Sequence, residues 1–305
     1  MSVLVTGASG FLGSRLVERL AAEGQEVVAL ARRPVPAIFE LNTRIHWIVR
    51  DIAQDGIDLG GLPDIETVVH LAGATLGAGK DENLFLTANE KTTVRLFQAL
   101  ADRVDRFIFA SSQVVYGDAR HLAVTEDFPM QPDGSAYACS KLNSENWLRW
   151  FQKRHGGQYL VLRFCGFIDG GGLVDYLIDR ALAGEAIDLY SSGNVRRDYL
   201  PSAEGVDALM AALKYGGAPG FLPVNIGSGQ AVSARELATL VCADLQSSSP
   251  IELLTDPSPQ NDFVFCIDRA RQLFNFRPGS VTDAVRNYAR HRQGQANRRV
   301  SNAKN

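Results

Sequence analysis

The sequence predicts an α/β fold in which a parallel sheet carries helices on both faces, followed by a smaller C-terminal lobe. Short β-branched runs alternate with helix-period segments through the first half of the chain. This alternation is typical of crossover connections, which join parallel strands. The first run also leads directly into a glycine-rich turn, and 305 residues are enough for one large domain and a smaller one. Sheets of this kind bind ligands at the carboxyl ends of their strands.

The predicted elements follow in order along the chain. Strands are expected at residues 2–6, 26–30, 46–49, 67–71, 107–110 and 159–163. After Phe164 the pattern is interrupted by glycines, and a helix at 173–182 is expected to lie in the lobe. A helix at 203–215 and a strand at 222–226 return to the sheet. We therefore predict a dinucleotide-binding domain at 1–164 plus about 196–242, a substrate-binding lobe at about 165–195 and 243–290, and a flexible tail at 291–305.

Composition excludes several classes of function. The net charge of −3 predicts no general attraction to nucleic acid or to an anionic membrane. No apolar run approaches the ~18 residues of a membrane span, and no secretory signal is expected. The four cysteines form no CxxC pair and are expected to be reduced thiols of a cytoplasmic protein. The five histidines show no HxH or HxxxH spacing, so no metal site is predicted.

The segment LVTGASGFLGSRL places Gly7, Gly10 and Gly13 between a strand and a helix. Glycines permit a tight turn and close backbone approach, and the N-terminus of the helix offers free N–H groups to a diphosphate. The GxxGxxG spacing is one residue longer than the GxGxxG fingerprint, and glycine trios alone are common. The strand–turn–helix context favours dinucleotide binding.

The end of the second strand carries Ala31, Arg32 and Arg33, where an acid for the adenosine ribose is usual. A carboxylate there accepts bonds from the ribose hydroxyls and repels a 2′-phosphate, whereas arginine does the opposite. Two solvated arginines after a strand are the alternative. The functional interpretation is a cofactor preference for NADP (NADPH), with NAD less favoured.

A predicted helix places Tyr137 and Lys141 four residues apart on one face. A phenol is a poor base at neutral pH, and a fixed ammonium beside it favours the phenolate. YxxxK is common by chance, and its weight comes from its position after the fifth strand. That strand ends in Ser111 and Ser112, and the Ser112 hydroxyl could hold a substrate oxygen during proton transfer, although a serine there is otherwise a local cap.

Taken together, these residues resemble the extended short-chain dehydrogenase/reductases, in the nucleotide-sugar epimerase/dehydratase branch. The resemblance runs from Val3 to about Pro278. It rests on these segments: TGASGFLG (6–13), DI (51–52), VVHLAG (68–73), Asn89, SSQVVYG (111–117), YACSK (137–141), LR (162–163), GNVRRDYL (193–200) and NIGSG (225–229).

The resemblance implies a Rossmann-type doubly wound sheet and a set of roles. Ser112, Tyr137 and Lys141 are implied as catalytic, with Asn89 supporting the lysine. Arg197 is implied to face the substrate diphosphate, and Ser112 to contact the substrate. The implied cofactor contacts, beside Tyr137, Lys141, Arg32 and Arg33, are Gly7, Ser9, Gly10, Phe11, Leu12, Gly13, Asp51, Ile52, Leu71, Ala72 and Gly73. The family often forms homodimers through the tyrosine-bearing helix, which here carries Trp147 and Trp150.

Departures from the family pattern narrow the activity. Family dehydratases place an acid pair after the catalytic hydroxyl, but Gln113 and Val114 stand here, so dehydration is not expected. A phosphate-contacting asparagine after the LR motif and a late arginine before Asp262 are also missing. Either the diphosphate of the substrate is held by fewer groups than is usual in the family, or the substrate is not a standard nucleotide sugar.

These observations predict an NADP(H)-dependent oxidoreductase of a small-molecule substrate, a nucleotide-activated sugar, acting as a 4-keto-sugar reductase. The alternatives are a 4-epimerase with a retained cofactor and a ketoreductase of a non-sugar substrate. A cofactor-sensing protein without catalysis is less favoured, because such proteins usually lose the tyrosine or the lysine.

Overall fold

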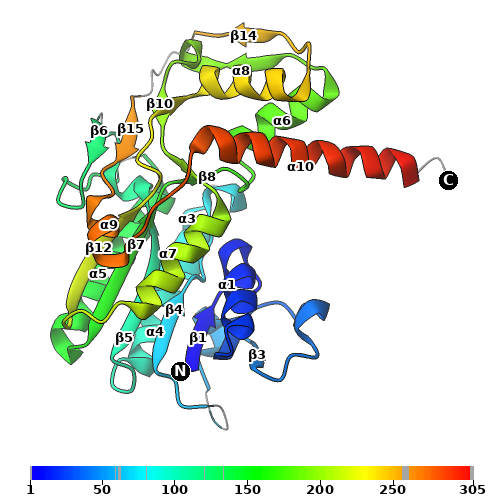
Figure 1. The fold of residues 1–305 in the computed structure, drawn as a ribbon. Helices are drawn as coiled ribbons and strands as arrows, with labels where there is room; N and C mark the ends of the chain where they lie inside the picture. The colour runs from blue at the N-terminus through cyan, green and yellow to red at the C-terminus, as the bar shows by residue number, and fades with distance from the viewer. Residues whose placement is uncertain are drawn as a thin grey trace.

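The body of the molecule is a seven-stranded sheet in which every neighbouring pair is parallel (Figure 1). This computed structural model describes residues 2–58, 60, 63–79, 81–119, 121–132, 134–255 and 261–302. In spatial order the strands are β12 (Gly220–Ile226), β7 (Gln158–Phe164), β5 (Arg106–Ser112), β4 (Thr67–His70), β1 (Ser2–Thr6), β2 (Glu26–Ala31) and β3 (Ile45–Val49). The chain turns one way from β1 to β3 and then crosses β1 to form β4, so the topological switch point lies between β1 and β4.

Helices cover both faces of the sheet, which is why its strands are apolar on both sides. Along β1, Val3 and Val5 join the core on one face and Leu4 joins the core on the other. The first core includes residues of α1, α7 and α9, and the second includes residues of α2, α4 and α5. Their bounds are α1 (Phe11–Ala22), α7 (Ser202–Lys214), α9 (Asp268–Phe274), α2 (Ile52–Asp55), α4 (Thr92–Leu100) and α5 (Ala136–His155). Each buried Val or Leu side chain stabilises this arrangement by about 1.5–3 kcal/mol.

The C-terminal lobe is built on three helices, α6 (Leu173–Ala183), α8 (Ala234–Leu245) and α10 (Val281–Asn302), which share a separate apolar core. Small sheets complete it and join it to the body. One is four-stranded, in the order β13 (Val232–Ser233), β10 (Arg196–Arg197), β15 (Phe263–Phe265) and β6 (His121–Val124). The other two are two-stranded: β14 (Ile251–Leu253) pairs with β9 (Ile187–Leu189), and β11 (Tyr199–Leu200) pairs with β8 (Gly166–Phe167). The remaining short helices are η1 (Ala37–Phe39), η2 (Leu76–Ala78), α3 (Glu82–Phe85), η3 (Leu86–Lys91), η4 (Gln113–Tyr116) and η5 (Tyr190–Gly193).

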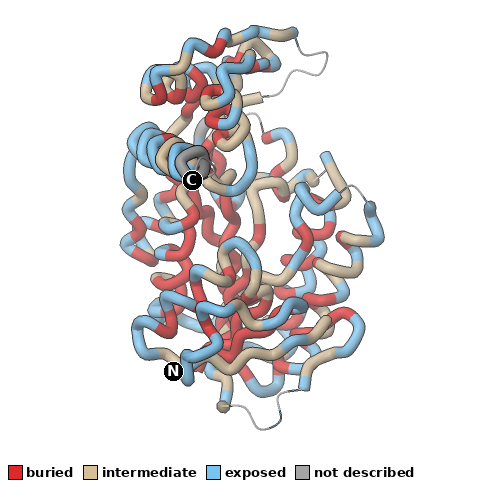
Figure 2. Tube along the Cα trace, turned by 90° about the vertical axis from the view of Figure 1, so that its right-hand side faces the viewer, coloured by how far each residue is buried: buried red, intermediate tan, exposed pale blue. Residues whose placement is uncertain are grey.

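The domain division differs from the predicted one at α8 and α9. Helix α8 packs its apolar stripe against α6 and α10 in the lobe, whereas the predicted boundaries place most of it in the sheet domain. The predicted boundaries place α9 in the lobe, but it packs against β12 and α7 of the body. The apolar spacing of a helix predicts which face is buried but not which partner covers it. In Figure 2 the buried parts of the trace run through the body, with a smaller group in the lobe.

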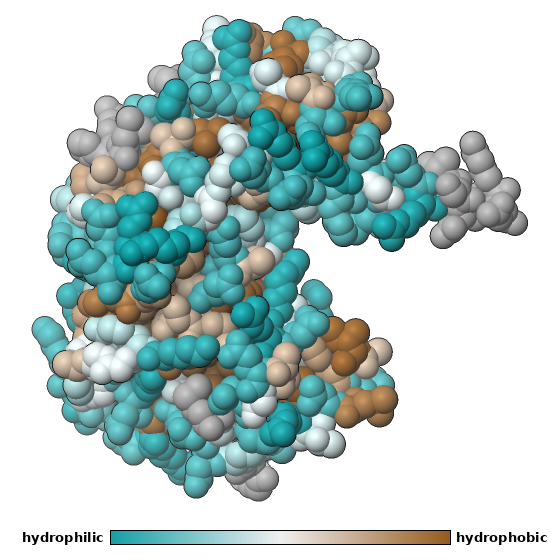
Figure 3. All heavy atoms as spheres, in the orientation of Figure 1, coloured by the Kyte–Doolittle hydropathy of each residue, from teal (hydrophilic) through white to brown (hydrophobic). Residues whose placement is uncertain are grey.

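The predicted flexible tail is also wrong for residues 291–302, which continue helix α10. Arg290 pairs with Asp244 of α8, and Arg292 pairs with Asp175 and Asp179 of α6, so side-chain contacts replace the missing apolar ones. Residues 303–305 lie outside the described part of the chain. Figure 3 shows α10 as a largely hydrophilic rod standing out from the body, with an open hollow beneath it. None of the helices in the described ranges is long and apolar enough to cross a bilayer.

Candidate active site

The glycine turn after β1 forms one wall of a cavity of about 640 Å³ at the switch point. Gly7 has φ +68°, and a β-carbon there would lie 2.7 Å from the backbone nitrogen of Ala72. A β-carbon at Gly13 would collide with the carbonyl oxygen of Gly7. Helix α1 begins after Gly10 with no side-chain cap and no acid in its first turn, so its N-terminal N–H groups are available to an anion. This cradle fits the diphosphate of a dinucleotide.

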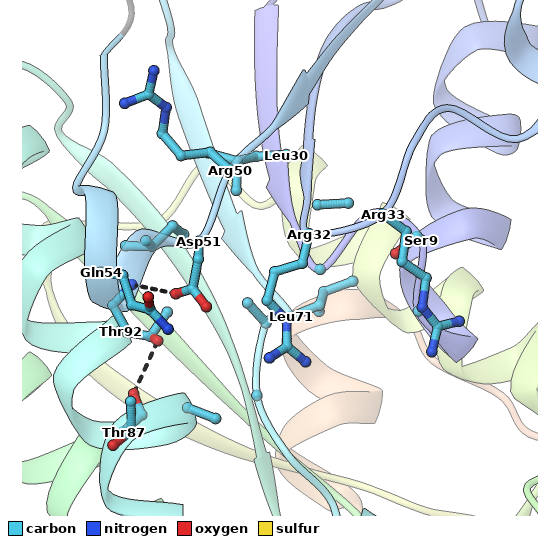
Figure 4. A pocket seen from close by; sticks show the side chains of 18 of the residues that line it. Ser9, Leu30, Arg32, Arg33, Arg50, Asp51, Gln54, Leu71, Thr87 and Thr92 are labelled. Atoms are coloured by element: carbon cyan, nitrogen blue, oxygen red, sulfur yellow. Dashed lines mark hydrogen bonds between the residues drawn. The ribbon is translucent and has the colours of Figure 1, made fainter. Parts of the chain in front are cut away.

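The far end of the cavity is lined by three arginines and one acid. Arg32 and Arg33 follow β2 and are exposed. Figure 4 shows their guanidinium groups pointing to one side, whereas the guanidinium group of Arg50 points the opposite way. The carboxylate of Asp51 accepts a bond of 2.9 Å from the backbone nitrogen of Ala53, which caps α2. The end of β2 therefore presents positive charge to the cavity, and no carboxylate stands there.

Asn89 connects the cavity floor to helix α5. It lies on the π-helical turn η3 and is 1% exposed. Its Oδ1 accepts a bond of 2.7 Å from the backbone nitrogen of Ala74, and its Nδ2 donates to Ser140 Oγ at 2.8 Å. A β-carbon at Gly73 would lie 2.8 Å from Asn89 Oδ1 and 3.7 Å from Lys141 Nζ. Asn89 thus supports the helix of the lysine through Ser140, without a direct bond to the lysine.

The three predicted catalytic residues come together where β5 meets α5. Ser112 ends β5, and its hydroxyl accepts a bond of 3.4 Å from the backbone nitrogen of Val114. Tyr137 and Lys141 lie on α5, which Ser135 caps by accepting from Ala138. Both side chains are buried, at 8% and 7% exposed.

Burial dominates the electrostatics of this pair. It raises the pKa of Tyr137 above its ordinary value, and a hydrogen bond with Ser112 acts in the opposite direction. Burial lowers the pKa of Lys141 to about 8, and the negative charge of Glu145 opposes this shift. Lys141 Nζ donates to the carbonyl of Ala110 at 2.9 Å and lies 4.9 Å from the centre of the Phe109 ring. The expectation that the lysine favours the phenolate is therefore not met in the free protein, because burial outweighs it: Tyr137 is a neutral phenol at neutral pH, suited to donating a proton.

A buried histidine that the sequence did not single out, His70 of β4, links β1 and α4 under the site. His70 Nδ1 lies 2.7 Å from Thr6 Oγ1, and His70 Nε2 lies 3.0 Å from Thr93 Oγ1. Because Thr93 donates to the carbonyl of Asn89, the ring donates from Nε2 and accepts at Nδ1. Burial lowers the pKa of His70 to about 3, so the ring stays neutral. Its only signal in the sequence is a single histidine at the end of an apolar strand.

The other predicted contacts divide into two groups. Gly7, Ser9, Gly10, Arg32, Arg33, Asp51, Ile52, Leu71, Ala72 and Gly73 line the cavity. Phe11, Leu12 and Gly13 form the first turn of α1 beside it, where the Phe11 ring packs edge-on against Phe167 at 5.5 Å. The cavity also takes in residues that were not predicted: Leu30, Ala31, Arg50, Ala53, Gln54, Leu84, Thr87, Ala88 and Thr92.

Arg197 lies apart from this cavity on β10 of the lobe. Its guanidinium donates to the backbone carbonyls of Arg196 and Asn261, and burial lowers its pKa. Its predicted role toward a substrate diphosphate stays a prediction.

Known proteins match this fold and these motifs. The NAD dependent epimerase/dehydratase family matches residues 3–227. A dTDP-4-dehydro-6-deoxy-D-allose reductase from a Streptomyces species is 31% identical over 280 residues, which cover 84% of this chain and 84% of that protein. A UDP-glucose 4-epimerase from Mycolicibacterium smegmatis is 32% identical over 261 residues, which cover 79% of this chain and 82% of that protein.

A solved structure agrees with the fold over nearly the whole chain. The UDP-glucuronic acid 4-epimerase from Bacillus cereus, crystallised in complex with NAD, aligns with a TM-score of 0.82 at 27% identity, over 95% of this chain and 99% of that one. The protein belongs to the NAD dependent epimerase/dehydratase family and is an NAD(P)-dependent enzyme of the extended short-chain dehydrogenase/reductase type.

Proposed function

We propose that this protein is an NADP(H)-dependent oxidoreductase of a nucleotide-activated sugar, acting as a 4-keto-sugar reductase. The observation that carries the cofactor choice is the end of β2, where Arg32 and Arg33 line the cavity and no carboxylate does. The acid in the same cavity, Asp51, is engaged with the N-terminus of α2. A guanidinium group binds a phosphate with charge-assisted hydrogen bonds, and only NADP(H) carries a phosphate at this end.

The substrate class is supported by the relatives. Proteins similar to this chain include reductases of dTDP-4-dehydro-6-deoxy sugars and 4-epimerases of UDP sugars. All of these names describe nucleotide-activated hexoses that react at carbon 4. The family includes dehydratases as well, and a dehydratase needs groups that can take and give protons beside the catalytic hydroxyl. Gln113 follows Ser112 here, and its amide can bind a substrate hydroxyl but cannot exchange a proton with it.

In the proposed reaction each catalytic side chain has one task. A nicotinamide cofactor held by the glycine turn and the end of β2 would supply the hydride that reduces the ketone carbon. Tyr137 donates its phenolic proton to the ketone oxygen, which suits a phenol whose pKa burial holds above the ordinary value. Ser112 orients that oxygen through a hydrogen bond, and Lys141, close to Gly73 on the cavity floor, holds positive charge beside the site.

The second candidate is a 4-epimerase that oxidises and re-reduces its substrate on one retained cofactor. Solved epimerase structures that resemble this chain contain NAD, which favours this alternative. A ketoreductase of a non-sugar substrate is the third reading, because the asparagine and the arginine that usually hold the substrate phosphates are missing from the sequence.

One experiment separates the three. The protein is first screened against nucleotide sugars by thermal shift with NADPH present, since a ligand that binds the folded state raises Tm. The stabilising sugars are then tested in two forms: the 4-keto sugar is mixed with NADPH and cofactor oxidation is followed by absorbance, and the 4-hydroxy sugar is incubated with the enzyme and analysed for its 4-epimer. A 4-keto-sugar reductase consumes NADPH in a one-to-one ratio with product. Interconversion of 4-epimers without net consumption of NADPH identifies the epimerase, and turnover of simple ketones alone identifies the ketoreductase of a non-sugar substrate.

We also propose that the protein is a cytoplasmic homodimer. The four cysteines are free thiols, which suits a reducing compartment. On α5, Trp147 and Trp150 are 41% and 48% exposed and pack edge-to-face at 6.1 Å, which is a large apolar area to leave in water. A second copy of α5 would cover it. Sedimentation analysis of wild type and Trp150→Arg tests this, and a monomeric wild type at micromolar concentration would refute it.

A further inference from the structure

Three consecutive residues of β5 each form a hydrogen bond with a different side chain of α5. The carbonyl of Ala110 accepts from Lys141, the hydroxyl of Ser111 donates to Glu145, and Ser112 bonds Tyr137. Along α5 these partners are spaced by four residues, so they form one stripe that lies on the end of β5. Two members of the stripe are the proposed proton donor and its lysine. The third, Glu145, has no role in the proposed reaction.

Glu145 is buried and its carboxylate is fixed by side chains of two strands. It is 1% exposed, and its Oε1 accepts from Ser111 at 2.5 Å. Arg163 of β7, itself 1% exposed, donates from Nε to Oε1 at 3.1 Å and from Nη2 to Oε2 at 2.7 Å. Burial alone would lower the pKa of Arg163, but the bonds and the charge of Glu145 outweigh it and hold that pKa above its ordinary value. The two-pronged bond fixes both position and orientation of the carboxylate.

Arg163 also contacts the segment that follows Ser112. Its Nη1 donates to Tyr116 Oη at 2.6 Å, and Tyr116 lies on η4 directly after Ser112. Tyr116 Oη in turn donates to Asn225 of β12 at 2.7 Å. The ion pair therefore touches the helix of Tyr137 on one side and the segment after Ser112 on the other.

We propose that Glu145, clamped by Arg163, is a positioning residue of the active site: it sets the face of α5 that carries Tyr137 and Lys141 against Ser112 and supplies the negative charge that keeps Lys141 protonated. The proposal rests on the proposed function for the meaning of its kinetic effects, but its electrostatic part needs neither cofactor nor substrate.

The surroundings of Lys141 explain why one buried carboxylate matters. Tyr137 and Glu145 face it from α5, and His70 faces it from β4 as a neutral ring. Arg163 from β7 is the positive group that pairs with the same carboxylate. Glu145 is thus the negative charge that opposes the effect of burial on Lys141.

The test compares Glu145→Gln with wild type and with Glu126→Gln. Glu126 is a matched control because it is also a buried carboxylate near Arg163, but it bonds the backbone of Asn225 rather than β5. Lysine side chains labelled with ¹³C are titrated by NMR; the chain has six lysines, so the Lys141 signal can be assigned by its loss in Lys141→Met. We expect Glu145→Gln to lower the Lys141 midpoint by about one pH unit or more, and Glu126→Gln to leave it in place.

Kinetics provide the second readout. With NADPH and an active sugar, Glu145→Gln should lower kcat by about 10-fold or more and move the basic limb of the pH profile to lower pH, with the Kd for NADPH within about threefold of wild type. A merely structural role would lower the amount of folded enzyme without moving the pH profile. If Glu145→Gln alone does not fold, the double variant Glu145→Gln/Arg163→Met removes both buried charges and is measured in its place.

The outcomes are separable. The inference is overturned if the titration midpoint of Lys141 is the same in folded Glu145→Gln as in wild type. It is also overturned if that midpoint in wild type has the ordinary value of a free lysine. An unchanged pH profile overturns it as well. If no nucleotide sugar is turned over by wild type, the proposed function fails, while the NMR titration still decides the role of Glu145.

Discussion

Replacing Arg32 with alanine removes one of the two positive charges at the end of β2 and leaves the rest of the cavity in place. Arg32 is exposed and lies at the rim of the cavity, outside the apolar cores, so the variant should fold as wild type does. NADPH and NADH differ only in the 2′-phosphate. The substitution therefore tests the cofactor assignment through a change in one affinity and not in the other.

The size of the effect follows from the exposure of the group. A hydrogen bond to a charged partner contributes about 1.5–3 kcal/mol, or about 10- to 150-fold in affinity. Because Arg32 lies in contact with water, solvent and salt weaken the attraction, and the lower part of that range applies. We expect Arg32→Ala to raise the Kd for NADPH by about 10- to 30-fold and to change the Kd for NADH by less than about threefold.

The assay is titration calorimetry of the free protein with each cofactor, repeated at two salt concentrations. Arg50→Ala is the matched control, since Arg50 lines the same cavity but points away from Arg32 and Arg33 in Figure 4. It should change both affinities by less than about threefold. Equal affinities of wild type for the two cofactors, or an Arg32→Ala variant that keeps its NADPH preference, would refute the reasoning. Either result would favour the NAD-retaining epimerase.

The remaining predictions concern the catalytic pair and the buried ion pair. Tyr137→Phe should lower kcat by about 10²- to 10⁴-fold and leave NADPH binding intact, because only the transferable proton is lost; activity within a few-fold of wild type would contradict the assignment. Since the pKa of Lys141 falls from 10.5 to about 8 in the folded state, the unfolded chain binds more protons between these values, and this group should raise the free energy of unfolding by about 2 kcal/mol from about pH 7 to about pH 9.5. Urea unfolding of Lys141→Met should lack this contribution; identical pH dependence in both proteins would show that folding leaves the pKa of the lysine unchanged. Arg163→Met should destabilise the protein by about 3–5 kcal/mol because it leaves the Glu145 carboxylate buried without its charged partner. Arg290 also pairs with a carboxylate but is exposed, so Arg290→Ala should have a much smaller effect on stability; equal losses of unfolding free energy in the two variants would contradict the distinction.

Local patterns in the sequence predicted the frame of the active site well. The strands of the sheet fall within one or two residues of their predicted positions, since apolar runs and glycine turns are local signals. The pairing of Tyr137 with Lys141 follows from a spacing of four residues on one helix, which needs no tertiary information. The Gly7 and Gly13 contacts likewise follow from a turn that must bring backbone close to backbone.

Other features depend on partners that are far apart in the chain, and no local pattern names such partners. Glu145 meets Ser111 across 34 residues and Arg163 across 18, so a carboxylate that looks like any polar helix residue in the sequence is a clamped internal charge in the fold. The same holds for α10, where Arg292 reaches α6 and turns an expected tail into a helix packed by ion pairs. The sequence by itself determined the sheet, the glycine turn after β1 and the placement of Tyr137 and Lys141 on one helix face, because these depend on short-range periodicity. Only the tertiary structure decided that the buried charge of Glu145 lies near Lys141 and how the arginines of the cavity are oriented, because burial and orientation arise when distant segments pack.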